Sequence, residues 1–164
     1  MTKTITAIFD TRRAMEEALR RFEAVNVTDE QINVIMSDET RNKFFKLETH
    51  NKADEGVAAG ATFGGIVGGV MAAIMGAGTL AIPGLNLIVV GSVVAGLAGA
   101  AVGAATGGIV GGLIGLGVPE HEAKLYEGQL KSGHILLAVE ARDAAQAKVL
   151  REILENTEAY NIAA

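Results

Sequence analysis

Few residues in this 164-residue chain have the types and spacing that a chemical site would need. Histidine occurs only at His50, His121 and His134, and cysteine is absent, which excludes disulfides and thiolate chemistry. His121 lies between Glu120 and Glu122, but the segment HEAKLYE lacks the second histidine of an HExxH zinc motif. We therefore interpret His121 as a solvated helix residue and predict no metal site.

Other patterns that are typical of catalysis or cofactor binding are incomplete. Gly76–Ala81 fits the formal pattern GxGxxA, but it follows a predicted helix, whereas a dinucleotide-binding loop follows a strand. Ser37 precedes Asp38 and Glu39 and has no basic residue with which to form a triad. Tyr126 is interpreted as a helix-packing residue and not as a proton donor. The sequence therefore predicts no catalytic residues, no cofactor and a protein that is not an enzyme.

The charge balance argues against two kinds of partner. Fourteen Lys and Arg against 19 Asp and Glu give a net charge of −5 at pH 7, which argues against nucleic acid and against polybasic attachment to anionic lipid. Arginine pairs flank Glu16 and Glu17 on one predicted helix, at Arg12, Arg13, Arg20 and Arg21. This spacing predicts a solvated, ion-paired helix face instead of an anion site. The first residues include no signal-peptide apolar region, so a cytoplasmic start is expected.

The elements that would position these residues begin with a first polar flank, residues 1–52. The apolar run 3–9 predicts a strand, and apolar residues at helical spacing from Ala14 to Val25 predict a helix that Asp10 or Thr11 caps. Residues 31–37 predict a second strand, and residues 38–52 are interpreted as a loop or a short helix.

The second polar flank, residues 119–164, completes the same predicted domain. Pro119 begins a helix that Gly133 ends, 134–141 is a strand, Asp143 caps a further helix and 159–162 is the last strand. Without the first of these helices, the two flanks have the order βαβ–βαβ. This order predicts an α+β fold, a ferredoxin-like split βαβ sandwich, with the first and third strands central and the second and fourth at the edges.

Between the flanks lies a segment without charge, predicted as an insertion over residues 53–118. Residues 56–119 contain no Asp, Glu, Lys, Arg or His over 64 positions. Two arms, 56–82 and 85–118, flank a predicted hairpin turn at Pro83 and Gly84. Glycine recurs at steps of four and would lie on one face of each helix, at Gly56, Gly60, Gly64, Gly68, Gly99, Gly103, Gly107, Gly111 and Gly115. Because missing side chains let another backbone approach closely, these glycines predict a glycine-zipper α-helical hairpin that interrupts the domain.

Both arms are longer than the ~20 residues that cross a bilayer, which favours a membrane-embedded hairpin. The flanking basic residues give only a weak positive-inside signal. The alternative is a soluble assembly in which copies of the chain bury one another's hairpins. A disordered linker is disfavoured, because linkers are polar and lack such a pattern.

These segments resemble a widespread bacterial family, the general-stress or low-temperature-induced proteins of unassigned function. The resemblance spans most of the chain and is most specific over 56–141. It rests on the sequence GLGVPEHEAKLYEGQLKSGHILLAVEA and on AIPGL at 81–85. The family implies a ferredoxin-like domain with a Gly-rich insertion and a membrane-associated, stress-linked protein, and it supplies no catalytic residues.

The sequence thus predicts a non-enzymatic, self-associating structural or stress-response protein. Its expected partners are the lipid bilayer and further copies of itself, and its expected location is the bacterial inner membrane with the α/β domain facing the cytoplasm. The alternative is a cytoplasmic homo-oligomer or a small-ligand-sensing α/β module with buried hairpins. The sequence specifies neither a ligand nor a stoichiometry.

Overall fold

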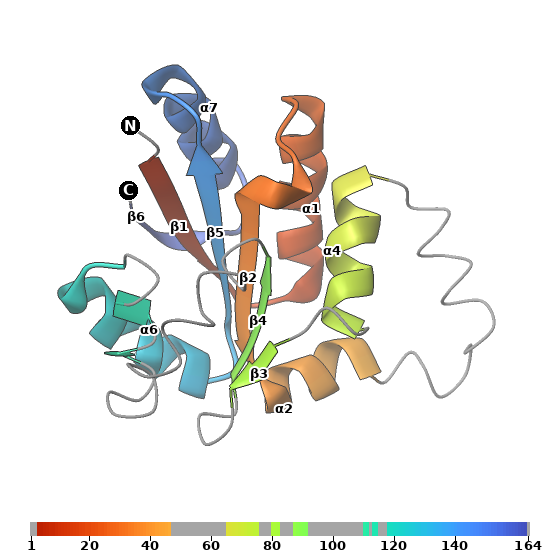
Figure 1. The fold of residues 1–164 in the computed structure, drawn as a ribbon, viewed down its shortest axis with the longest axis vertical. Helices are drawn as coiled ribbons and strands as arrows, with labels where there is room; N and C mark the ends of the chain where they lie inside the picture. The colour runs from red at the N-terminus through yellow and green to blue at the C-terminus, as the bar shows by residue number, and fades with distance from the viewer. Residues whose placement is uncertain are drawn as a thin grey trace.

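The computed structural model describes residues 3–46, 65–75, 80–82, 87–91, 110–111, 113–114 and 118–163. Helices pack on one sheet, which confirms the α+β class (Figure 1). The strands are β1 (Lys3–Phe9), β2 (Ile32–Ser37), β3 (Leu80–Ile82), β4 (Leu87–Gly91), β5 (Ile135–Ala141) and β6 (Tyr160–Ala163). The helices are α1 (Arg12–Ala24), α2 (Asp38–Arg41), α4 (Gly65–Met75), α6 (Glu120–Lys131) and α7 (Ala144–Glu155), with a 3-10 turn η1 (Asp29–Gln31) and a π turn η2 (Asn42–Lys46). The strands and helices that the sequence predicts in the two flanks are therefore confirmed to within a residue or two.

The sheet has the strand order β3-β4-β2-β5-β1-β6, and all neighbouring strands are antiparallel. The longest pairing joins β1 to β5, from Lys3 opposite Ala141 to Phe9 opposite Ile135. The first and third predicted strands, β1 and β5, are central, and β6 is an edge, as the sequence predicts. The prediction that β2 is an edge is wrong, because β4 pairs with it from Asn33 to Ser37.

The uncharged segment contributes to this sheet. Two helical arms were expected over 56–82 and 85–118, and this expectation is wrong for 80–82 and 87–91, which form β3 and β4. The β-branched run Ile88-Val89-Val90 favours a strand, and β2 offers it a backbone ladder. Because β3 pairs antiparallel with β4, the chain reverses between Ile82 and Leu87. The predicted turn residues, Pro83 and Gly84, lie between these strands and outside the described residues.

The two faces of the sheet are covered by different helices. On β1, Ile5, Ala7 and Phe9 belong to one core with buried residues of α1, α4 and α7. Ile8 belongs to a second core, which includes Tyr126 and other residues of α6. Successive side chains of a strand point to opposite faces, so this alternation gives the sheet two buried sides.

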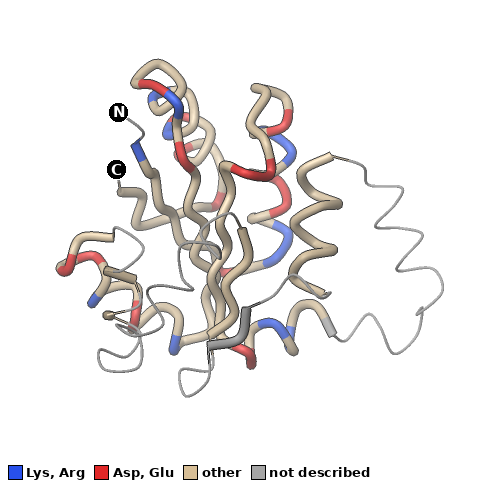
Figure 2. Tube along the Cα trace, viewed as in Figure 1, with Lys and Arg blue, Asp and Glu red and all other residues tan. Residues whose placement is uncertain are grey.

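Helix α4, from the uncharged segment, packs onto the domain. It contacts α1 and β4 and buries a row of large apolar side chains, namely Ile66, Val67, Val70, Met71 and Ile74. Charged residues mark α1, α6 and α7, whereas α4 has none (Figure 2). Gly65 begins α4 at φ +83°, and the carboxylate of Glu23 occupies the space that a Cβ would take. An acidic side chain at a helix N-terminus is favourable, because the helix dipole is positive there.

No helix within the described ranges combines the length and the apolar character that a bilayer crossing requires.

The helix ends follow the caps that the sequence indicates. Thr11 accepts a hydrogen bond from the backbone N–H of Ala14 at 3.2 Å, so Thr11 and not Asp10 caps α1. Asp143 caps α7 by accepting from Gln146 N at 2.7 Å. Gly133 has φ +93° and ends α6 in a Schellman motif, in which the N–H groups of residues 133 and 134 donate back to the last turn.

Candidate functional site

A hollow on the described surface lies between α1 and the turn from α7 to β6. It has a volume of about 820 Å³. Its lining combines three arginines and three glutamates with small and polar residues: Arg13, Ala14, Glu17, Arg20, Arg21, Glu155, Asn156, Thr157 and Glu158. We call this hollow the α1–α7 groove. Its size is that of a ligand site, but its lining is far more charged than the mostly apolar lining of such sites.

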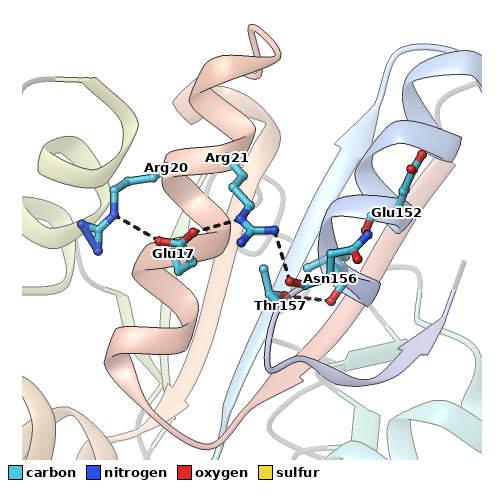
Figure 3. A network of polar contacts seen from close by, with 7 residues as sticks. Glu17, Arg20, Arg21, Glu152, Asn156 and Thr157 are labelled. Carbon is cyan, nitrogen blue, oxygen red and sulfur yellow. Dashed lines mark hydrogen bonds and ion pairs between the residues drawn. The ribbon is translucent and has the colours of Figure 1, made fainter.

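Ion pairs along α1 account for most of the arginines in this region. Glu17 contacts Arg21 at 2.9 Å and Arg20 at 3.8 Å, and Arg21 also donates to the carbonyl oxygen of Asn156 at 3.1 Å (Figure 3). Arg12 pairs with Glu16 at 2.6 Å. The interpretation of this face as an ion-paired helix surface is therefore confirmed. Exposed i,i+4 pairs of this kind stabilise a helix only by a few tenths of a kcal/mol.

A second polar cluster lies where β1 ends and where β5 and β6 begin. The carboxylate of Asp10 accepts a hydrogen bond from the Tyr160 hydroxyl at 2.6 Å and lies 2.9 Å from Nε2 of His134. Nδ1 of His134 lies 2.9 Å from the carbonyl oxygen of Gln129. Both ring nitrogens thus face oxygen atoms of neighbouring elements. The cluster ties the end of α6 to three strand ends, and it includes no Ser or Thr nucleophile.

The buried tyrosine of α6 contacts the central strand β1. Tyr126 is 1% exposed, and its hydroxyl lies 2.6 Å from Oγ1 of Thr6. Burial raises the pKa of Tyr126, an effect that the hydrogen bond with Thr6 partly opposes. This environment confirms that Tyr126 packs α6 onto the sheet. Burial, followed by the hydrogen bond to Asp10, also raises the pKa of Tyr160.

These two tyrosines predict a loss of stability at alkaline pH. In the folded state, a tyrosine with a raised pKa is stabilised in its neutral form. Its contribution to the free energy of unfolding is therefore complete below the pKa of an unfolded tyrosine, about 10, and declines as the pH rises above that value. We expect the free energy of unfolding, measured by urea titration and circular dichroism, to fall between about pH 10 and 11. In Tyr126→Phe this fall should be smaller than in the wild type. An equally steep fall in the variant would contradict the assignment to Tyr126.

The predicted helix-packing residues are mostly outside the described part of the chain. This holds for Gly56, Gly60, Gly64, Gly99, Gly103, Gly107 and Gly115. Gly68 lies in α4 and is buried. Gly111 lies in a short helical stretch and is partly exposed. The structure therefore does not bring the predicted glycine rows together within the ranges that it describes.

The two histidines within the described ranges do not form a common site. His121 is exposed and lies 3.7 Å from Glu122, while His134 belongs to the cluster with Asp10, and His50 lies outside the described residues. Across the described ranges, no group of three His, Asp or Glu side chains could hold a metal ion.

Sequence reasoning missed a polar network that joins the start of β2 to the end of β5. The side-chain oxygen of Gln31 accepts from Arg142 Nη2 at 3.0 Å, and its amide donates to the carbonyl oxygen of Glu140 at 2.6 Å. Arg142 also donates to the carbonyl oxygen of Asn26 at 3.0 Å. Gln31 is 8% exposed, and a buried amide needs such partners. The one local sign of this network in the sequence is a glutamine, Gln31, that directly precedes an apolar strand.

The fold and these clusters define an α+β protein whose described polar groups mostly hydrogen-bond within the domain. Comparison with known protein families, with curated proteins and with solved structures finds no match to this chain.

Proposed function

We propose that this protein is a non-enzymatic, self-associating protein that attaches to the bacterial inner membrane, with its α+β domain on the cytoplasmic side. The observation that carries the proposal is the uncharged run of 64 residues, 56–119, with glycine at every fourth position in long stretches. A lipid bilayer, or other copies of the chain, would shield such a surface from water. The polar clusters of the domain support a structural role, because their main contacts join its own elements.

We also propose that the domain has a ferredoxin-like core. Within the sheet, β2, β5, β1 and β6 are neighbours in that order, and each adjacent pair is antiparallel. Together with α1 and α7, they give the connectivity of two split βαβ units. In this proposal β3 and β4 extend the four-stranded sheet beyond β2. Helix α6 covers the face of the sheet that α1 and α7 leave uncovered.

The glycine zipper is proposed mainly for the second arm, because α4 of the first arm packs its large apolar side chains into the core of its own domain. Gly99, Gly103 and Gly107 would then lie at the contact between copies, where a backbone meets a backbone. A role in stress adaptation rests on the family resemblance alone, and it would consist of scaffolding or stabilising the membrane.

The test combines membrane extraction with substitutions in the second arm. We expect the full chain to stay in the membrane pellet after washing with urea at neutral pH. In neutral detergent, Gly103→Leu and Gly107→Leu should each weaken self-association at least about tenfold, because a large side chain holds the backbones apart. Analytical ultracentrifugation measures this change.

The matched control is Ile109→Leu, which keeps an apolar residue of the same volume in the same arm and should leave self-association unchanged. Release of the wild-type chain by urea would favour a soluble assembly over membrane attachment. Equal effects of Gly103→Leu and Ile109→Leu would remove the argument for glycine packing.

A further inference from the structure

The α1–α7 groove has one basic wall and one acidic wall. Arg13, Arg20 and Arg21 come from α1, where Glu17 offsets one of their charges, and Glu155 and Glu158 come from the end of α7 and the turn beyond it. All the ion pairs described for the α1 wall run along α1, between residues three or four positions apart. The two walls therefore keep opposite net charges on either side of the hollow.

Several charges at the rim of the groove have no counter-ion in the described part of the chain. Arg13, Glu155 and Glu158 form no ion pair there, and all three are exposed. Arg20 has a side chain that is 48% exposed, and its contacts with Glu16 and Glu17 are long, at 3.8 Å each. The groove thus presents both charge signs to a partner at low desolvation cost.

We infer that the α1–α7 groove is a docking surface for a second copy of this chain. A two-fold axis through the groove would place the basic wall of each copy against the acidic wall of the other, so that one surface is complementary to itself. Charge complementarity favours this occupant, because the two walls carry net charges of the same size and opposite sign. A purely anionic or purely cationic ligand would meet repulsion from one wall. The inference rests on the self-association part of the proposed function.

The contact between the walls is electrostatic and therefore sensitive to salt. At physiological ionic strength, salt screens the interaction between exposed charges that are more than a Debye length apart. Charges on two walls that face each other directly are closer than this, so their attraction persists. Charge complementarity mainly selects the partner and its orientation. The α1–α7 groove would then set how two domains face each other, while the glycine-rich arms supply the apolar contact.

The experiment reverses one wall at a time in the full chain, in neutral detergent. The first variant is Arg13→Glu with Arg20→Glu, which makes both walls acidic, and the second is Glu155→Arg with Glu158→Arg, which makes both walls basic. Each variant alone should lose at least about tenfold in self-association, because like charges then face each other. An equimolar mixture should form a mixed dimer with at least the wild-type affinity. Differently tagged chains and analytical ultracentrifugation measure both results.

The control changes the net charge by the same amount as the first variant, at another place in the fold. Lys124→Glu with Lys131→Glu alters α6, which lies on the other face of the sheet, and it should leave self-association unchanged. Rescue in the mixture also shows that both wall variants are folded. If either wall variant associates like the wild type, or if the mixture does not pair, another occupant fills the groove and the inference is overturned.

The outcomes separate this inference from the proposed function. If Gly103→Leu weakens association and the wall variants do not, the groove inference alone fails. If the wall variants weaken association and Gly103→Leu does not, glycine packing alone fails. A wild-type chain that stays monomeric in detergent would overturn both.

Discussion

Replacing Gly91 by alanine is expected to lower the free energy of unfolding by about 3 kcal/mol or more. Gly91 ends β4 opposite Asn33 of β2 and has φ +133°, a region that side chains with a Cβ rarely adopt. An added Cβ would also collide with the carbonyl oxygen of Ile32 and would lie 2.8 Å from Cα of Asn33. Both obstacles are backbone atoms of a central strand, so a change of side-chain rotamer cannot relieve them.

Urea titration of the purified chain in mild detergent, followed by circular dichroism, measures this loss. The matched control is Gly128→Ala in α6, where nothing lies within 4 Å of the added Cβ. That substitution should stabilise the protein by up to about 1 kcal/mol, because alanine favours a helix more than glycine does. Similar effects at the two positions would show that β4 does not approach β2 as closely as described.

Gly91 also shows where prediction from the sequence stops. In the sequence, Gly91 falls within the second predicted helical arm, 85–118, eight positions before Gly99, so the pattern of small residues predicts a helix there. In the structure, it is the point where two strands come close together. The residues around a glycine look the same in the sequence whether it lies on a helix face or at a close approach of two strands. What distinguishes the two settings is the partner strand β2, which lies more than 50 positions earlier in the chain.

The flanks were predictable because their signals are local. Apolar spacing in α1, the Thr11 and Asp143 caps and the Gly133 end of α6 each involve residues within one or two turns. Pairing of β4 with β2 depends instead on a backbone ladder between distant segments, and hydrophobic periodicity carries no information about it. Residues on both faces of β2 are buried, but one face carries Asn33 and Ser37 beside Ile35, so its sequence does not mark β2 as a central strand.

The polar clusters show the same division between local and distant contacts. The ion pairs of α1 follow from i,i+4 spacing and were predicted, whereas the contact of Asp10 with His134 and Tyr160 joins three separate elements. It could be anticipated only once β1 was known to lie between β5 and β6. The groove between α1 and the end of α7 likewise arises from helices that are adjacent only in the folded chain.

The second large effect is expected at Ile74 in α4. Ile74 is fully buried against the main core, so Ile74→Ala should cost about 2–5 kcal/mol through lost burial and the cavity that it leaves. Its neighbour Met75 is 40% exposed, so Met75→Ala should change the free energy of unfolding by less than about 1 kcal/mol. The same denaturant titration compares the two variants.

This pair of neighbours tests whether the uncharged segment belongs in part to the domain. If α4 packed chiefly against lipid or against another copy of the chain, truncating Ile74 would affect association more than folding. With α4 in the core, Ile74→Ala should instead lower stability and leave the dissociation constant of self-association unchanged, because Ile74 faces the sheet of its own chain. In that case α4 and β4, both from the uncharged segment, complete the core of the domain. If Met75→Ala lowered the free energy of unfolding and Ile74→Ala did not, the face of α4 that carries Met75 would be the one that packs on the core.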